Sequence, residues 1–399
     1  IDNTTLLLNA PIYRACHEIA LKLAKGKTKI DPRALPGDFA FRCFLANCLY
    51  ILEDAGFGEH KAGEWIIQPE YALPDVADIL KEVYGERSER VVEAVLINDA
   101  YAEALERIDA LHAAEKAGVE EEAHSPAFIS EATLDHQAVH SPATRARAEL
   151  VLAAVETALT SAGTTNSLRI VEAGTVSPAF SRSLANLAAR YQAALTIVEP
   201  RENAQRNLEI AFEDDAHVHV LKKDEIADIP AFDLLVSASG SVFSLIDEDT
   251  ALRGVIREKL RSGGALVMAA NAPTMFSDFA FGLTENWFAR SQAVEFPVGR
   301  LATTSQWQKC LDDLGLRNIV VEDREIAYGN IIAIEAQSGV TEAAVADEAA
   351  VSTDPILLLH GAATVVTPAE NLIPVALAGE LEDDKVRLEA AAQCKTDTA

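Results

Sequence analysis

The sequence is poor in positive charge. It contains 34 Lys and Arg residues against 62 Asp and Glu residues, which gives a formal net charge of −28 at pH 7. Nucleic acids and anionic membrane surfaces would repel such a chain, so neither is expected as a partner. The sequence also lacks an apolar run of about 18 residues, which a membrane-spanning helix needs. No transmembrane segment is therefore predicted.

Cysteine is scarce as well. The five cysteines are scattered in apolar contexts and form no Cys-x-x-Cys pair. This pattern is typical of buried, reduced thiols in a cytoplasmic protein. The first residues, Ile1-Asp2-Asn3, include no initiator methionine, basic region or signal-like core. We interpret this start as a cut inside a larger polypeptide.

The overall composition is that of a globular protein. Apolar residues make up 49% of the chain and charged residues 24%, and 399 residues are enough for two or three domains. We expect residues 1–140 to form a helical subdomain. Apolar residues recur there at three- and four-residue spacing, in the segments 11–25, 38–53, 74–84 and 87–117.

A second region, 141–337, begins with a helix that Ser141 caps and Pro142 opens. From residue 168 short β-type runs alternate with helical stretches, which predicts an α/β fold with a parallel sheet covered on both faces. The expected strands are 168–172, 194–199, 217–221, 232–237 and 265–270, and the helices between them 178–191, 201–212 and 248–261. Tyr328-Gly329 joins segments 318–322 and 330–335, which predicts a closing antiparallel hairpin.

The last region, 338–399, is expected to be a linker and a C-terminal segment. Residues 338–353 are rich in Ala, Glu and Ser, a composition typical of linkers. Segments 355–360 and 372–377 could be strands, followed by a helix at 381–392. This piece is either the edge of a neighbouring domain or a segment packed on the core.

The first strand-to-helix turn is where an open parallel sheet usually binds its ligand. Here it runs from Glu172 through Gly174 and Val176 to Pro178. A loop for a nucleotide or S-adenosylmethionine needs several glycines, because its backbone takes positive φ and approaches the ligand closely. With Gly174 alone, we expect a structural turn in which Glu172 and Gly174 are vestiges of a cofactor site.

Two further acidic residues follow the next strands. Glu199 ends the second strand, where nucleotide-binding sheets use an acidic residue to hold ribose hydroxyls; a solvated strand-end carboxylate is an equal alternative. Asp224, just past the third strand, could face an adenine amino group. The charged cluster 222–225 around it is also typical of a solvated loop.

The histidines offer no clear site. His136 and His140 could share a helical face as metal ligands, but no matching acidic or cysteine motif follows, so no metal site is predicted. His217 and His219 alternate on a predicted strand, where a core or edge role is expected. No spacing supports a Ser-His-Asp arrangement.

The most specific motif lies at residues 281–288, Phe-Gly-Leu-Thr-Glu-Asn-Trp-Phe. It resembles the segment that carries the catalytic glutamate in C-methyltransferase domains of modular (type I) polyketide synthases. The order of segments from about residue 74 to 335 is similar to that family. Further matching segments are 135–159 with Ser141-Pro142-Ala143, 232–236, 261–270, and 297–315 with Trp307, Leu311 and Gly315.

This resemblance implies a class I methyltransferase sheet, which is Rossmann-like, with residues 1–140 as a helical lid. It also implies methyl transfer from S-adenosylmethionine to the α-carbon of a β-ketoacyl chain held on an acyl carrier protein. In that family a histidine is the base that removes the α-proton, a task that suits histidine near neutral pH, and Glu285 would orient it. The alignment places Val242 where the histidine is expected.

The donor loop is thus degenerate and the base is absent. These two losses predict a non-catalytic pseudo-methyltransferase with no bound cofactor, whose partners in a cytoplasmic multienzyme are the neighbouring synthase domains and the acyl carrier protein. The alternative is an active S-adenosylmethionine-dependent C-methyltransferase in which Glu285, or a water it holds, is the base. A third possibility is that the cleft implied by the methyltransferase resemblance binds a different small molecule or a carrier-bound chain.

Overall fold

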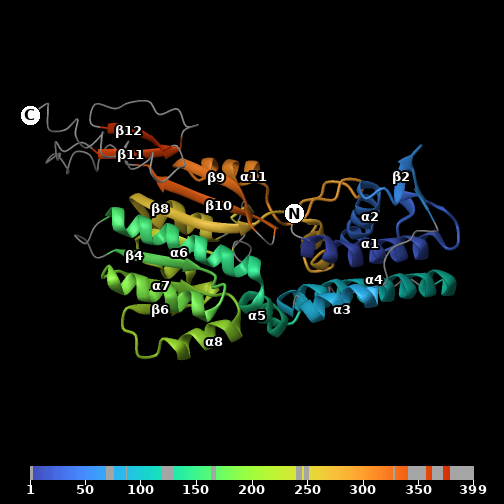
Figure 1. Ribbon diagram of the computed structural model, residues 1–399, viewed down its shortest axis with the longest axis horizontal. Coiled ribbons are helices and arrows are strands. Elements are labelled where there is room, and N and C mark those ends of the chain that lie inside the picture. Colours follow the sequence, from blue (N-terminus) through green and yellow to red (C-terminus); the bar gives the residue numbers. More distant parts are fainter. Residues whose placement is uncertain are drawn as a thin grey trace, which may run out of the picture. The chain divides into compact units, whose positions relative to one another are not determined.

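The structure of the chain is a computed structural model, shown in Figure 1. The chain divides into two compact units, Ile1–Gly339 and Val340–Ala399. The residues that the structure describes are 3–68, 76–86, 88–118, 129–162, 168–239, 245–246, 251–326, 329–339, 356–361 and 372–377.

The first unit begins with a helical part. Its main helices are α1 (Asn3–Ala24), α2 (Phe39–Asp54), α3 (Val76–Glu86) and α4 (Val91–Ala117), which confirms the four predicted helices. Their apolar faces meet in one core cluster, in which Ile12, Phe44 and Ile108 are fully buried. Asp38 caps α2, its Oδ1 accepting the Phe41 amide hydrogen at 2.8 Å.

The small sheet and the two short helices of this part were not predicted from the sequence. Strands β1 (Lys29–Ile30), β2 (Gly58–Lys61) and β3 (Glu64–Ile67) form an antiparallel sheet of order β1-β3-β2. The short helices η1 (Pro32–Ala34) and η2 (Ser88–Arg90) precede α2 and α4. Helix α5 (Glu131–His140) is capped by Ser130, and the Ser141 amide ends it by donating to Gln137.

The sheet part is built on seven strands in the order β6-β5-β4-β7-β8-β10-β9. Strands β6, β5, β4, β7 and β8 are parallel, and β10 pairs antiparallel with both β8 and β9. This arrangement confirms the predicted parallel sheet with its closing hairpin. The bounds are β4 (Arg169–Ala173), β5 (Ala194–Val198), β6 (Val218–Leu221), β7 (Phe232–Ser237), β8 (Leu260–Asn271), β9 (Leu316–Ile326) and β10 (Gly329–Ser338).

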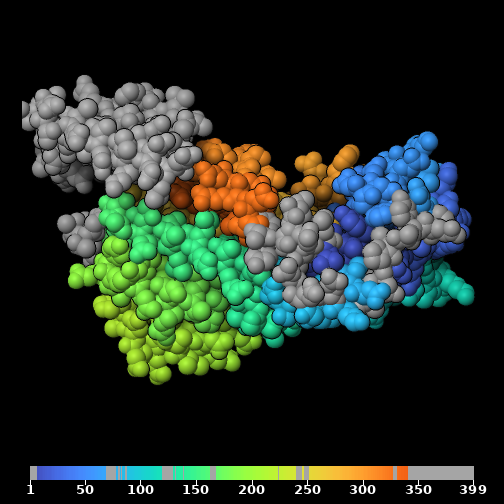
Figure 2. Space-filling model, viewed as in Figure 1, coloured from blue at the N-terminus to red at the C-terminus, as the bar shows by residue number. Residues whose placement is uncertain are grey.

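Helices cover both faces of this sheet. Apolar residues of α6 (Pro142–Ala162), α7 (Pro178–Arg190) and α8 (Glu202–Ala211) share one core cluster with the strands, and these helices form a continuous green surface in Figure 2. Residues of α9 (Ala251–Lys259) and α11 (Thr304–Asp313) share the other. The short helix η3 (Lys223–Asp228) connects β6 to β7.

Strand β8 is longer than predicted and starts at Leu260, so the helix expected at 248–261 extends too far. A Cβ atom on Gly264 would lie 2.9 Å from the carbonyl oxygen of Asp233 in β7. The missing side chain therefore lets this part of β8 approach β7 closely. The Arg-Ser-Gly-Gly sequence at 261–264 belongs to this strand.

Helix α10 (Met275–Ala280) and the segment after it join the two parts of the first unit. Phe279, Leu283 and Phe288 belong to the core cluster of the helical part, although they follow β8 in the chain. The resemblance motif at 281–288 thus lies in the packing between α10 and helices α1, α2 and α4.

In the second unit the structure describes two strands, β11 (Ile356–Gly361) and β12 (Leu372–Leu377), which pair in parallel. Both strands confirm the prediction. The predicted linker beyond residue 339 and the predicted helix at 381–392 lie outside the described residues.

Four cysteines (Cys16, Cys43, Cys48 and Cys310) are buried and free, as predicted, and Cys394 lies outside the described residues. No helix in the described ranges is long and apolar enough to cross a membrane.

Candidate functional site

The turn after β4 is folded into the core of the sheet part. Gly174 has φ 71° and is the one residue of the turn 172–178 with positive φ, so the predicted glycine requirement applies at that position. Val176 and Phe180 are buried in the cluster under α6 and α7. Ser177 caps α7, its Oγ accepting the Phe180 amide hydrogen at 3.2 Å. The turn is a structural start of α7, as the sequence indicates.

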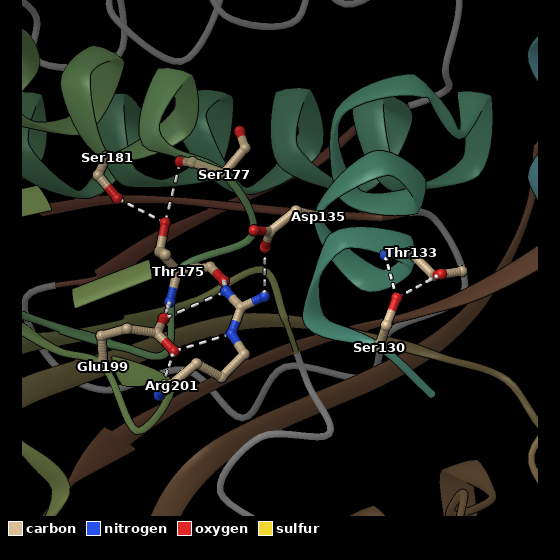
Figure 3. Close-up of polar contacts among 8 residues, drawn as sticks. All are labelled: Ser130, Thr133, Asp135, Thr175, Ser177, Ser181, Glu199 and Arg201. Atoms are coloured by element: carbon tan, nitrogen blue, oxygen red, sulfur yellow. Dashed lines mark hydrogen bonds and ion pairs between the residues drawn. The ribbon is translucent and has the colours of Figure 1, made fainter. Parts of the chain in front are cut away.

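Glu199, just past the end of β5, binds this turn directly (Figure 3). Its Oε2 accepts the Thr175 amide hydrogen at 2.8 Å, and the residue is 1% exposed. Of the two alternatives for Glu199, the solvated strand-end carboxylate is therefore wrong. The carboxylate is buried and holds the first turn of the sheet to the end of the second strand.

Arg201 occupies the other side of the same carboxylate. Its backbone amide and its Nε donate to Oε1 of Glu199 at 3.0 and 2.9 Å. Its Nη2 donates to the carbonyl oxygen of Thr175 at 3.0 Å, and its Nη1 to Oδ1 of Asp135 on α5, also at 3.0 Å. Figure 3 shows the guanidinium between Glu199, Thr175 and Asp135. Both oxygens of Glu199 are thus bound by donors of the protein itself.

The sequence did not identify Arg201 as a functional residue. The local signal is an arginine two residues after the strand-end acid, and nothing local reveals the contact with Asp135, 66 residues earlier. Because Arg201 joins α5, the β4 turn and the end of β5, it fixes the region where a nucleotide-binding sheet would hold its ligand.

Glu172, in β4, lies beneath the turn and is fully buried. Ser181 on α7 donates to its Oε1 at 2.8 Å. Burial raises the pKa of Glu172 to about 8, and the charge of Glu199 adds to this rise, while the hydrogen bonds from Ser181 and Thr175 oppose it. At neutral pH Glu172 is therefore mainly protonated.

Asp224 lies exposed in η3, consistent with the solvated-loop alternative.

A cavity of about 690 Å³ lies between the helical part and the carboxyl-end edge of the sheet. Thr175, Val176 and Arg201 contribute to its wall, together with residues of α1, α4, α5, α6 and α10. The described lining residues do not include Glu172, Gly174, Glu199 or Asp224. The structure therefore places the predicted cofactor residues behind the cavity wall or, for Asp224, on the outer surface.

Glu285, by contrast, is exposed and lines the cavity beside Thr284 and Trp287. It has no hydrogen bond or ion pair to any described residue. The described lining contains no histidine, cysteine, lysine or aspartate, so no imidazole is paired with Glu285 in that part of the wall. Val242, the expected position of the histidine, lies outside the described residues.

The rest of the motif at 281–288 is held by packing. Trp287 stacks on Phe281 with ring centroids 5.4 Å apart, and its Nε1 donates to Oδ1 of Asp278 at 3.0 Å. Burial raises the pKa of Asp278 to about 6. A Cβ atom on Gly282 would lie 2.3 Å from the Asp278 carbonyl oxygen and 2.6 Å from Cδ2 of Phe44. Glycine is therefore required at position 282 for the close contact with α2.

A second polar pair lies in the cavity wall at the start of α4. Arg90 and Glu93 are both buried, and Nη1 of Arg90 lies 3.0 Å from Oε1 of Glu93. Burial raises the pKa of Glu93 to about 7, although the charge of Arg90 acts in the opposite direction.

The four histidines considered in the sequence are not among the described residues that line this cavity. His136 and His140 share a face of α5, as predicted, with ring centroids 4.3 Å apart. Among the described residues no group of three or more His, Cys, Asp or Glu is arranged to hold a metal ion. His217 and His219 are exposed at β6, an edge strand, so the edge role rather than the core role applies.

Comparison with solved structures identifies the fold. The CMeT domain of the citrinin polyketide synthase has a TM-score of 0.62 at 14% identity, over 84% of this chain and 89% of that chain. The DszA carbon methyltransferase has a TM-score of 0.60 at 13% identity, over 84% and 89%. The CurJ carbon methyltransferase has a TM-score of 0.58 at 15% identity, over 85% and 94%. The chain has the carbon methyltransferase fold.

This fold confirms the predicted class I methyltransferase sheet. It also agrees with the motif at 281–288, which indicated C-methyltransferase domains of polyketide synthases. No protein-family model and no curated protein sequence matches the chain. Within the carbon methyltransferase fold, the cavity wall includes Glu285, Arg201 and Thr175.

Proposed function

We propose that this chain is a non-catalytic pseudo-C-methyltransferase domain of a polyketide synthase. Its role is structural, within a cytoplasmic multienzyme, where it contacts the neighbouring synthase domains and the acyl carrier protein. The proposal takes its family from the motif at 281–288 and from the carbon methyltransferase fold.

One observation carries the proposal. Glu199, the acid that would hold the ribose of S-adenosylmethionine, accepts hydrogen bonds from Thr175 and Arg201 with both of its oxygens. A donor molecule would have to break these contacts and separate the guanidinium of Arg201 from the carboxylate of Glu199. Breaking a buried ion pair typically costs about 3–5 kcal/mol, which the binding energy of the donor would have to offset.

The residues around Glu285, where the catalytic base is expected, support the same conclusion. No histidine lies in the described cavity wall near Glu285, and the aligned position carries Val242. Loss of a general base typically slows a reaction by about 10²–10⁴-fold. The bound state of Glu199 and the lack of a histidine in the described wall therefore support the loss of two independent requirements of methyl transfer.

Calorimetric titration with S-adenosylmethionine and with S-adenosylhomocysteine tests the donor half of the proposal. We expect no binding heat from either compound, while an active methyltransferase measured in parallel gives a normal isotherm. Micromolar affinity for either compound would overturn the proposal.

The alternative function is an active S-adenosylmethionine-dependent C-methyltransferase, and the exposed carboxylate of Glu285 in the cavity favours it. A methyl-transfer assay with a β-ketoacyl thioester on a carrier protein separates the two. Methylated product that depends on Glu285, and is lost in Glu285→Gln, would establish the alternative. We expect no product from the wild type.

A further inference from the structure

Basic residues outnumber acidic residues in the described cavity wall, whereas acidic residues outnumber basic ones in the chain as a whole. The protein has 62 acidic residues against 34 basic ones. The described residues that line the cavity instead include four arginines (Arg90, Arg147, Arg201 and Arg300) but only two carboxyl residues (Glu93 and Glu285). A concave site with an excess of positive charge favours an anion locally, even in a protein of negative net charge.

Two of these arginines already have a carboxylate partner. Arg90 is paired with Glu93, and Arg201 is paired with Glu199 and Asp135. Arg147, on α6, differs from both. No carboxylate of the described residues forms an ion pair with it, although it is only 5% exposed.

The contacts of Arg147 are made to neutral acceptors. Its Nε donates to the carbonyl oxygen of Ala238, just after β7, and its Nη1 donates to the side-chain oxygen of Asn271, at the end of β8. Nη2 has no hydrogen-bond partner among the described residues. These contacts fix the plane of the guanidinium and leave donor capacity on the side of the cavity that Arg147 lines.

A buried cation without a counter-charge is costly, and proteins normally pair such groups or use them. Burial lowers the pKa of Arg147 to about 10, so the guanidinium remains charged at neutral pH. The planar guanidinium matches the geometry of a carboxylate or a phosphate, and of these the carboxylate carries the single charge that balances the single charge of Arg147. The missing counter-charge is therefore best supplied by a carboxylate ligand.

The rest of the cavity indicates the body of that ligand. Met275, Phe276, Phe281, Trp287 and Leu301 supply an apolar wall from α10 and the segment after it. A volume of about 690 Å³ is in the range that holds a small organic molecule. A highly polar ligand would leave this wall without a partner, whereas an alkyl or aryl chain would cover it.

We propose that the cavity binds a monocarboxylate with an apolar body, with its carboxylate on Arg147 and its chain against the aromatic wall of α10. This ligand differs from a thioester, whose acyl group carries no charge where a free acid does. The inference does not rest on the absence of methyl transfer.

The first test compares two probes of the same chain length on the wild-type protein. Octanoate and octan-1-ol are titrated by calorimetry at pH 7.5, since the first supplies a carboxylate and the second a neutral hydroxyl. We expect octanoate to bind about tenfold or more tightly than octan-1-ol, the ratio expected for a charge-assisted hydrogen bond. Equal affinities, or no binding of octanoate, would overturn the proposal.

The second test removes the guanidinium. Arg147→Met should weaken octanoate binding about tenfold or more and leave octan-1-ol unchanged, and Arg147→Lys should fall between the two. Arg190→Met, which alters an exposed arginine on α7 paired with Glu156, is the matched control and should bind octanoate like the wild type. Undiminished octanoate binding by Arg147→Met would contradict the assignment.

Thermal melting of the variants shows whether they are folded. Because Arg147 is a buried charge that pairs with no carboxylate of the described residues, Arg147→Met is expected to melt no lower than the wild type. If it does not fold, the comparison of octanoate with octan-1-ol on the wild type still decides the proposal.

Binding of S-adenosylmethionine in a parallel titration would overturn the proposed function alone. Failure of octanoate to bind would overturn this inference alone.

Discussion

Arg201 and Glu199 form an ion pair in which Nε lies 2.9 Å from Oε1; the Glu199 side chain has no exposed surface, and that of Arg201 is 20% exposed. The pair lies where the first two strands of the sheet end, and Arg201 also binds the carbonyl oxygen of Thr175. It therefore fills with protein atoms the position at which nucleotide-binding sheets usually hold a ribose. Its contribution to folding is the first measurable consequence.

Replacing Arg201 by methionine should destabilise the fold by about 3–5 kcal/mol, because it leaves the buried Glu199 carboxylate without a cation. The double variant Glu199→Gln/Arg201→Met should recover part of this loss, since the amide is neutral. Denaturant unfolding, followed by circular dichroism, measures both differences.

The matched control is Arg190→Met. Arg190 and Glu156 are 3.1 Å apart, but their side chains are 62% and 49% exposed. An exposed pair contributes about 0–1 kcal/mol, so this variant should unfold close to the wild type. Equal losses for Arg201→Met and Arg190→Met would contradict the role given to the Arg201–Glu199 pair.

Gly282, in the motif, is predicted to tolerate no side chain. Gly282→Ala would place Cβ 2.3 Å from the Asp278 carbonyl oxygen, and overpacking of this kind costs about 1–3 kcal/mol. Gly254→Ala is the control, because nothing lies within 4 Å of a Cβ at this position in α9; it should stabilise by about 0.5–1 kcal/mol. Thermal melting compares the two, and opposite shifts in melting temperature are expected.

The sequence predicts the sheet well, because the strands and helices of an α/β fold carry local periodicity and turn signals. The five parallel strands and the closing hairpin confirm this. The small sheet β1-β3-β2 was missed. Its strands have two to four residues, too few for an alternating pattern, and β1 pairs with β3 some 35 residues later.

The candidate site was only partly predictable, and the reason is distance along the chain. Gly174 was identified because one position of the turn needs positive φ, which is a local property. The burial of Glu199 could not be decided, since it depends on Thr175 and on Arg201, which Asp135 of α5 positions. The same holds for Arg147, whose acceptors lie 91 and 124 residues further on.

Glu172 gives the protein a pH dependence whose sign follows from burial. Its pKa is raised from 4.5 to about 8 in the folded protein, while the unfolded chain has an ordinary glutamate. Below about pH 4.5 the carboxyl is protonated in both states, and its contribution to stability is fully present. Between these values unfolding releases a proton, so stability falls as pH rises, by at most about 1.4 kcal/mol per pH unit.

Glu172→Gln removes this titration while keeping a hydrogen-bond acceptor for Ser181. We expect wild type and variant to have similar stability near pH 5, and the variant to become progressively more stable from there up to about pH 8. Denaturant unfolding at a series of pH values measures the difference, with Glu258→Gln, on the exposed side of α9, as the control. A difference between wild type and Glu172→Gln that stays constant across this range would show that Glu172 is ionised in the folded state, contrary to the burial argument.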